Sequence, residues 1–275
     1  MLNIKKVALS CAFLIGLNAG SAQAENCGEV SITEMDWGSA VIVTQVAKFL
    51  LEQGYGCSVT VVPSASTPAL ASVSETGEPD IITEVWTNGA PAYVPLLEAG
   101  KINELTNVLS DGGLEGLFIP VYLAEAHPEL TTIEGVLANP DLVGNRMHNC
   151  PVGWTCQVVA SNVAKAGGFE AAGVEDFVHG SGETLTASIG AAYAAKEPWF
   201  GYYWTPSLVM GKYPMVQVDL GPHDASKQAC NSDKECATPT MQSWPSSVVT
   251  TVVTSEFESS HPAETDLMRN LSFTN

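Results

Sequence analysis

Short runs of β-branched residues alternate with stretches of helical periodicity from Val30 onward. A first strand is expected over residues 30–33, and Ser39 then caps a helix whose apolar residues recur at helical spacing until Gly54. Further strands are expected over 81–86 and 248–254. Strands that alternate with helices favour α/β units around mostly parallel sheets, so the chain is predicted to be an α/β protein.

The order of these segments also predicts two lobes. An apolar run near residues 116–122 leads into a new series of strands and helices, and the run over 248–254 returns to the first series. We expect a first lobe of residues 25–120 plus 245–275, a second lobe of residues 121–244, and a ligand cleft between them. The sequence stops at Asn275 soon after an expected helix, which is compatible with a fragment that lacks a final helix.

The amino terminus has the pattern of a secretory signal peptide. Lys5 and Lys6 precede an apolar run over residues 7–17, and small residues follow at Ala22 and Ala24. That run is shorter than the roughly 20 residues needed to span a bilayer. Residues 1–24 are therefore predicted to be a signal peptide that exports the protein to the periplasm.

The composition is strongly acidic, with 11 Lys plus Arg against 30 Asp plus Glu and a formal net charge of −19. Such a charge disfavours binding to nucleic acid and to anionic membranes. It would concentrate a cationic ligand, but surface solubility is the preferred explanation, so the charge alone favours a cation only mildly.

Six cysteines remain beyond the signal segment, and an even number in an exported chain indicates disulfides. By proximity the expected pairs are Cys27 with Cys57, Cys150 with Cys156, and Cys230 with Cys236. A zinc site is the alternative, but there is no Cys-x-x-Cys spacing and the expected compartment is oxidising.

Tryptophans occur at the expected carboxyl ends of strands or in loops. They are Trp37, Trp86, Trp154 and Trp204. Ligands of open α/β sheets collect at these strand ends, so the rings could converge on one cleft and bind a quaternary ammonium group by cation–π attraction. Each ring taken alone could equally be an ordinary core aromatic, which is what we expect of Trp199 and Trp244. Alternation along the strand places Tyr202 on the same face as Trp204.

The run over residues 150–156 precedes an expected helix. The amides of Thr155 and Cys156 would be free first-turn donors, which favours an anionic group there. A disulfide-closed turn without a ligand is the alternative interpretation.

At these residues the chain resembles the periplasmic glycine betaine and proline betaine binding proteins of ABC importers, whose relatives bind choline or trimethylamine N-oxide. The resemblance covers nearly the whole chain after the signal segment, and its most specific parts are Trp86-Thr87, the 150–156 loop and the 202–206 segment. It implies a two-lobed type II periplasmic binding protein, not an enzyme, that delivers a methylated amine to a membrane permease. We expect a monomer without cofactor.

The resemblance also implies residue roles. Trp86, Trp154 and Trp204 would box the trimethylammonium head, and the amides of Thr155 and Cys156 would bind the betaine carboxylate. Trp37 would be the extra cage residue of the choline-binding relatives.

One position departs from the betaine binders, which carry a histidine where this chain has Ala90. That loss would suit a ligand with a smaller anionic end, such as trimethylamine N-oxide. Glu34, Asp36 and Glu84 could form an acidic wall that suits choline, or be ordinary solvated carboxylates.

Between Cys230 and Cys236, oxygen-bearing side chains occupy alternate positions at Asn231, Asp233 and Glu235. This resembles the start of a calcium loop, so a structural calcium ion is a candidate. The loop lacks the glycine and the distal glutamate of a full EF-hand, which favours a stapled hairpin instead.

An exported hydrolase is a second function class. The sequence has no nucleophile elbow and no His-Glu-x-x-His motif, so binding is preferred. A ligand-sensing domain without an importer remains a third possibility.

Overall fold

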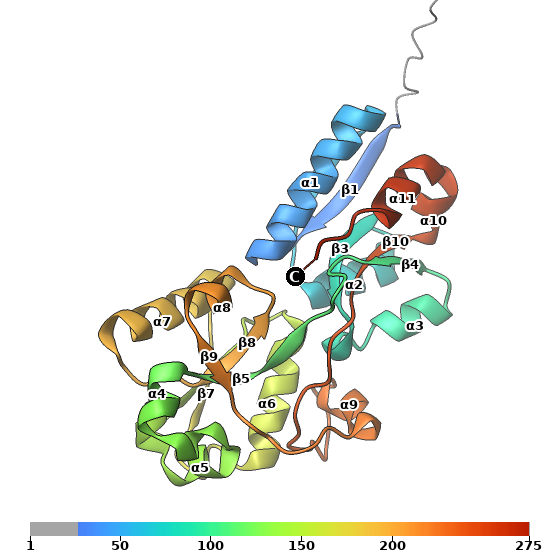
Figure 1. Cartoon of the computed structure of the whole chain (residues 1–275). Helices are drawn as coiled ribbons and strands as arrows, with labels where there is room; N and C mark the ends of the chain where they lie inside the picture. The colour runs from blue at the N-terminus through green and yellow to red at the C-terminus, as the bar shows by residue number, and fades with distance from the viewer. Residues whose placement is uncertain (1–26, 275) are drawn as a thin grey trace, which may run out of the picture.

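A computed structural model of the chain describes residues 27–274, which form two α/β lobes, one above the other in Figure 1. The predicted signal peptide, residues 1–24, lies outside the described residues. Within the described part of the chain, no helix has both the length and the apolar character required to cross a membrane.

The first lobe contains a five-stranded sheet. Its strands, in spatial order, are β2 (Ser58–Pro63), β1 (Glu29–Glu34), β3 (Ile81–Trp86), β10 (Val249–Thr254) and β4 (Ile102–Asn107). Its helices are α1 (Gly38–Tyr55), α2 (Ser66–Thr76), the short 3-10 helix η1 (Thr87–Gly89), α3 (Tyr93–Glu98), α10 (Ser255–Ser260) and α11 (Pro262–Arg269).

Two interior strands of this sheet, β3 and β10, are rich in β-branched and apolar residues. Every residue of β3 and of β10 is buried, as expected for strands with neighbours on both edges. Helix α1 ends where Gly56 adopts a left-handed conformation with φ 70° and donates its N–H to the carbonyls of Glu52 and Leu51. The carboxyl end of β3, at Trp86, lies at the edge of the sheet that faces the second lobe.

The second lobe contains another five-stranded sheet. Its strands, in spatial order, are β7 (Glu175–Val178), β6 (Arg146–Asn149), β8 (Gly201–Thr205), β5 (Leu114–Pro120) and β9 (Met215–Gln217). Its helices are α4 (Val121–Ala126), η2 (Pro128–Thr131), α5 (Ile133–Ala138), η3 (Pro140–Val143), α6 (Thr155–Gly167), α7 (Gly182–Ala195), α8 (Leu208–Lys212) and α9 (Ala225–Asn231).

Both sheets are mixed, but in each of them one strand alone opposes the direction of the others, so the prediction of mostly parallel sheets is confirmed. In the first sheet β10 runs antiparallel to both β3 and β4. In the second sheet β5 runs antiparallel to both β8 and β9. β5 and β10 are the strands that the chain enters directly after crossing from the other lobe. Strands that follow a helix of the same lobe start at one end of the sheet, and β5 and β10 start at the opposite end, so they run antiparallel to their neighbours.

The two crossings of the chain meet at one backbone pairing. Gly113 and Ser247 donate their N–H groups to each other's carbonyl, each at 2.8 Å. Because β5 lies in the second sheet, that sheet begins at Leu114, before the limit of 120/121 predicted for the second lobe. The lobe limits themselves stay a prediction.

Three disulfides join the cysteines that were paired by proximity. They are Cys27–Cys57, Cys150–Cys156 and Cys230–Cys236. The first joins the start of β1 to the start of β2, the second closes the turn before α6, and the third closes the turn after α9.

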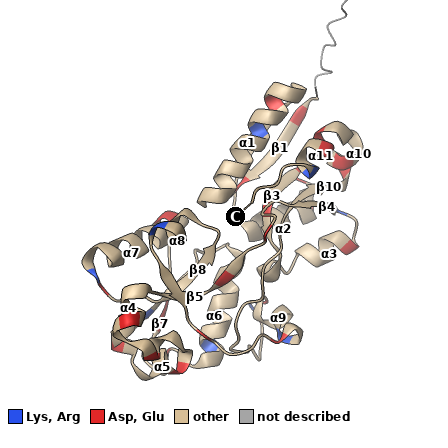
Figure 2. Ribbon diagram, viewed as in Figure 1, with Lys and Arg blue, Asp and Glu red and all other residues tan. Residues whose placement is uncertain are grey.

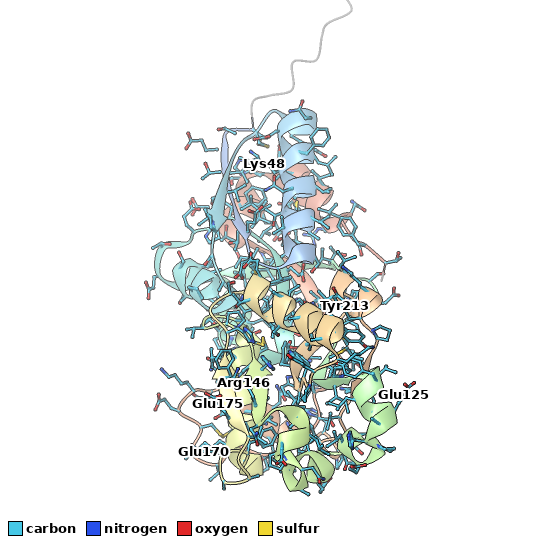
Figure 3. The ribbon with its side chains drawn as sticks, turned by 90° about the vertical axis from the view of Figure 1, so that its left-hand side faces the viewer. Lys48, Glu125, Arg146, Glu170, Glu175 and Tyr213 are labelled. Atoms are coloured by element: carbon cyan, nitrogen blue, oxygen red, sulfur yellow. A yellow bond between two sulfur atoms is a disulfide. The ribbon has the colours of Figure 1, made fainter. Side chains whose placement is uncertain are left out.

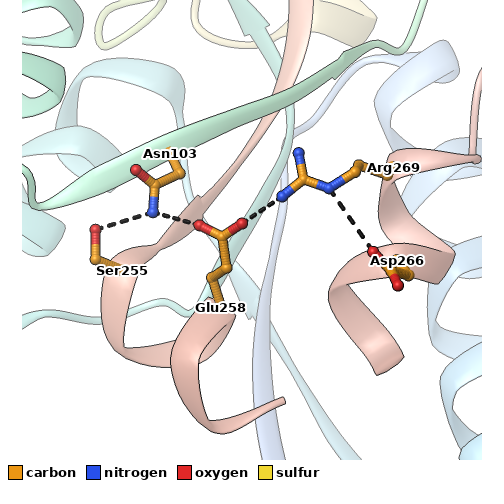
Figure 4. Close-up of polar contacts among 5 residues, drawn as sticks. All are labelled: Asn103, Ser255, Glu258, Asp266 and Arg269. Carbon is orange, nitrogen blue, oxygen red and sulfur yellow. Dashed lines mark hydrogen bonds and ion pairs between the residues drawn. The ribbon is translucent and has the colours of Figure 1, made fainter. Parts of the chain in front are cut away.

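The last helices are fixed to the first sheet by a polar network, which Figure 4 shows in close-up. Asn103 of β4 donates to Ser255 at 3.1 Å and to the carboxylate of Glu258. Glu258 also pairs with Arg269, whose Nε lies 3.8 Å from Asp266. The returning segment is thus part of the first lobe, as its β10 strand already indicates.

Candidate functional site

The tryptophans singled out in the sequence lie around one small cavity between the lobes. The first lobe supplies Trp37 and Trp86, and the second supplies Trp154 and Trp204. The complete lining is Trp37, Ser66, Trp86, Glu115, Trp154, Thr155, Cys156, Tyr202 and Trp204. Trp199 and Trp244 are buried outside this lining, as expected of packing residues.

Each ring is placed by the end of a strand or by the start of a helix. Trp86 is the last residue of β3 and Trp204 lies in β8. Trp37 and Trp154 are the N-cap residues of α1 and α6, and both have extended backbones. The rings therefore gather where strands end and helices begin, which is the usual ligand edge of an α/β sheet.

The four rings form a chain of edge-to-face contacts. Ring centroids lie 5.1 Å apart for Trp37 and Trp154, 5.5 Å for Trp154 and Trp204, and 6.4 Å for Trp204 and Trp86. Aromatic edges carry positive charge and faces negative charge, so each edge occupies a position that a cation would also favour. The remaining cavity is about 20 Å³, close to the volume of one water molecule.

The lobes touch each other beside the cavity. Thr67 donates its N–H to the carbonyl of Gly153 at 3.1 Å, and the indole N–H of Trp154 donates to the exposed Asp36 at 2.7 Å. Gly89 approaches Thr155 so closely that a Cβ on residue 89 would lie 2.9 Å from the Cβ of Thr155. The structure is therefore a closed arrangement of the two lobes.

Glu84, predicted to contact the ligand, lies behind the rings and does not line the cavity. Its Oε1 accepts hydrogen bonds from the indole N–H groups of Trp37 at 2.7 Å and Trp86 at 2.9 Å. Burial, the largest effect, raises the pKa of Glu84 above its ordinary value, while these hydrogen bonds act to lower it. Of the other proposed acidic residues, Glu34 bonds Gln45 and Asp36 bonds Trp154.

The sequence did not single out two residues that line the cavity, Ser66 and Glu115. Glu115 is fully buried and accepts hydrogen bonds from the hydroxyl of Tyr202 at 2.6 Å and from Ser247. Burial raises the pKa of Glu115, and both hydrogen bonds oppose that rise. The available signal was an acidic residue directly before the apolar strand 116–120, which also fits an ordinary strand end.

Thr155 and Cys156 line the cavity as expected, at the start of the 13-residue helix α6. Their position gives the cavity the positive end of a helix, opposite the acidic groups. The hydroxyl of Tyr202 is engaged with Glu115, so its ring and not its hydroxyl faces Trp204, at a centroid distance of 6.3 Å.

The residues of the possible calcium loop have other uses in this structure. The amide of Asn231 bonds both the N–H and the carbonyl of Thr240, at 2.9 Å and 2.8 Å. Asp233 accepts from the N–H of Glu235 at 2.9 Å. Among the described His, Cys, Asp and Glu residues, the one close group of three is Cys27, Cys57 and Glu264, where both cysteines are in a disulfide. A calcium ion stays a prediction.

A wider hollow, of about 770 Å³, lies on the outside of the second lobe, where α6 ends and β7 begins. Its lining mixes both charges, with Lys165, Glu170 and Glu175, and includes none of the four tryptophans around the small cavity. Size alone therefore does not mark the functional site.

Comparison with solved structures identifies the class of fold. An ABC-transporter choline binding protein in complex with choline superposes with a TM-score of 0.69 at 18% identity, over 90% of this chain and 79% of that one. A glycine betaine, L-proline binding protein from Borrelia burgdorferi gives 0.71 at 18%, over 90% and 82%. Lactococcal OpuAC, closed on glycine betaine, gives 0.68 at 15%, over 90% and 85%.

At these identities the likeness shows the fold, and the prediction of a two-lobed type II binding protein is confirmed. No curated protein matches the sequence significantly. Residues 28–275 match the family described as the substrate binding domain of ABC-type glycine betaine transport systems, and the chain belongs to that family. The family resemblance expected from the sequence is thereby confirmed, and the family is one of transport components rather than enzymes.

Proposed function

We propose that this chain binds a small trimethylammonium compound of the glycine betaine type between its lobes and delivers it, in the periplasm, to the permease of an ABC importer. The observation that carries the proposal is the meeting of four indole rings from both lobes around one cavity. A trimethylammonium group has no N–H to donate to a polar pocket. A desolvated cation over an indole face gains ~2 kcal/mol, so aromatic faces suit it.

The start of α6 supports a ligand with an anionic end. The backbones of Thr155 and Cys156 border the same cavity, and first-turn amides attract carboxylate or oxide oxygens. Glycine betaine carries a methylated cation and a carboxylate in one small molecule, and would use both halves of the site.

The acidic side of the cavity favours two other ligands, choline and trimethylamine N-oxide. An ionised Glu115 would attract the cation of choline and repel the carboxylate of glycine betaine. A neutral Glu115 would be able to donate a hydrogen bond to the single oxygen of trimethylamine N-oxide. Ala90, in place of the histidine of the betaine binders, is consistent with either of these ligands.

Binding requires the rings to separate. The cavity of about 20 Å³ holds roughly one water, so any methylated amine has to displace the edge of one indole from the face of the next. The ligand's methyl groups would then replace these edge-to-face contacts, and the lobes would close again around it.

Isothermal titration of the exported chain with glycine betaine, choline and trimethylamine N-oxide tests the proposal and ranks the ligands. Glycine, which lacks the methyl groups, is the matched control. Saturable binding of at least one methylated amine, without binding of glycine, is expected. Absence of binding by all three would refute the proposal, and product formation from any of them would support an enzyme instead of a binding protein.

A further inference from the structure

One carboxylate oxygen in the first lobe holds two of the cage rings. Oε1 of Glu84 accepts from Nε1 of Trp37 at 2.7 Å, from Nε1 of Trp86 at 2.9 Å and from the hydroxyl of Ser39 at 2.9 Å. Glu84 is completely buried, in the fully buried strand β3. Both rings are therefore attached, through their edges, to the same acidic group.

This acidic group has no basic partner among the residues that the structure describes. Among residues 27–274, none of the ion pairs includes Glu84, and its other oxygen, Oε2, is buried without a hydrogen bond. Lys48 pairs with Glu52, and Arg146 pairs with Glu175. Figure 3 shows Lys48 and Arg146 in separate lobes, and Figure 2 shows blue segments on helices such as α1 and α9 rather than along β3. When Glu84 is ionised, a cation bound at the rings would be its counter-charge.

Charge at the edge of an indole ring changes what its face attracts. A cation over the face of Trp37 or Trp86 interacts with the ring quadrupole and also with a carboxylate hydrogen-bonded to that ring. Little water lies between them in a buried site, so the interaction is stronger than it would be at a surface. An uncharged molecule of the same shape gains nothing from the carboxylate.

We propose that Glu84 is a positioning residue whose charge, transmitted through Trp37 and Trp86, gives the cage its preference for a cation over a neutral molecule of identical shape. The proposal rests on the proposed function, since it assumes that the four rings bind a methylated ammonium. The inference goes beyond the proposed function because it assigns the selection of charged ligands to Glu84, a residue that does not line the cavity.

The test compares ligands that differ only in replacing the quaternary nitrogen by carbon. Choline is paired with 3,3-dimethylbutan-1-ol, and glycine betaine with 3,3-dimethylbutanoate. Affinities of the native chain and of Glu84→Gln are measured by calorimetry, with competition against the charged ligand where the carbon analogue binds weakly. Glu84→Gln keeps a hydrogen-bond acceptor for the rings and removes the charge.

We expect Glu84→Gln to weaken the charged ligand by about tenfold and the carbon analogue by less than about twofold. Equal losses for both ligands would assign Glu84 a purely structural role, and no loss for either would also overturn the proposal. Glu264→Gln, at a buried carboxyl in α11, is the matched control and should leave both affinities unchanged.

A second variant covers the case in which Glu84→Gln does not fold. Trp37→Phe keeps an aromatic face and removes the N–H that binds the carboxylate, so it should also lower the ratio between the charged ligand and its analogue. An unchanged ratio would contradict the proposal. Failure of the native chain to bind any methylated amine would instead refute the proposed function.

Discussion

The two lobes hold their tryptophans in different ways. In the first lobe, Trp37 and Trp86 donate their N–H groups to Glu84 of the same lobe. In the second lobe, Trp154 donates its N–H across the cleft to Asp36, and the N–H of Trp204 has no hydrogen-bond partner among the described residues. One half of the cage is thus complete within its own lobe, and the other half depends on contact with the opposite lobe.

This difference indicates which half is preorganised. A ring that is fixed before the ligand arrives loses little freedom on binding, while a ring whose partner lies across the cleft is fixed only when the lobes close. The first lobe would therefore receive the ligand, and the second would complete the site. Three variants test this contrast, in order of decreasing effect on affinity.

Removing Trp154 should have the largest effect. Trp154→Ala deletes a proposed cage face and also the hydrogen bond to Asp36, so we expect affinity for the preferred methylated amine to fall at least tenfold, by ~1.4 kcal/mol or more. Calorimetry measures the loss, and an unchanged unfolding temperature shows that the fold is intact. An unaltered affinity would exclude Trp154 from the site.

Blocking the approach of the lobes should have the next largest effect. In Gly89→Ala the new methyl group would lie 2.9 Å from the Cβ of Thr155 and would oppose closure. We expect a loss of ~1 kcal/mol, about fivefold in affinity. Gly54→Ala, at a helical position with open space, is the control. If both variants bind equally well, closure at Gly89 does not contribute to binding.

Breaking the contact between the lobes at Asp36 should have a smaller effect. Asp36→Ala removes the acceptor for the Trp154 N–H, and the loss of one partly buried hydrogen bond predicts about threefold weaker binding. The change should appear as faster dissociation in stopped-flow fluorescence. Glu34→Ala removes a nearby carboxylate that bonds Gln45 instead, and should leave the rate unchanged.

Lowering the pH should reduce the stability of the second lobe through a residue that does not line the cavity. Burial and the neighbouring His179, 2.9 Å away, lower the pKa of His148 to about 3. The unfolded chain takes up a proton at about pH 6.5 while the folded chain does not, so the free energy of unfolding should fall from pH 6.5 toward pH 3 and then level off.

Hydrogen exchange at pH 7 and pH 4.5 would locate this loss of stability around β6. His148→Asn should reduce the pH dependence, and His127→Asn, outside the histidine pair, should retain it. Equal acid sensitivity in His148→Asn and the native chain would contradict this origin.

Sequence reasoning located the elements whose pattern is local. Strand β3 was found because apolar and β-branched residues fill it, whereas β4, with the sequence INELTN, was missed because polar residues interrupt it. Helix α9 was missed because it is short and lies in a polar segment closed by cysteines. The directions of β5 and β10 could not be read from the sequence, since they depend on where the chain crosses between lobes.

The site was predictable to a similar extent. Tryptophans at strand ends are visible in a sequence, and their meeting place followed from a general rule for α/β sheets. The hydrogen-bond partners of Glu84 and Glu115 could not be predicted. The sequence does not distinguish a buried carboxylate that lacks a basic partner from an ordinary carboxylate on the surface. That distinction needs the distances from Glu84 to both indoles and from Glu115 to Tyr202.

The reciprocal bonds between Gly113 and Ser247 tie the two crossings into one narrow ribbon. Sliding of the two crossings past each other would break these hydrogen bonds, whereas bending of the paired segment would keep them, so bending is the motion of the lobes that this pairing favours. A membrane partner that contacts both lobes could then distinguish a loaded molecule from an empty one by the angle between the lobes.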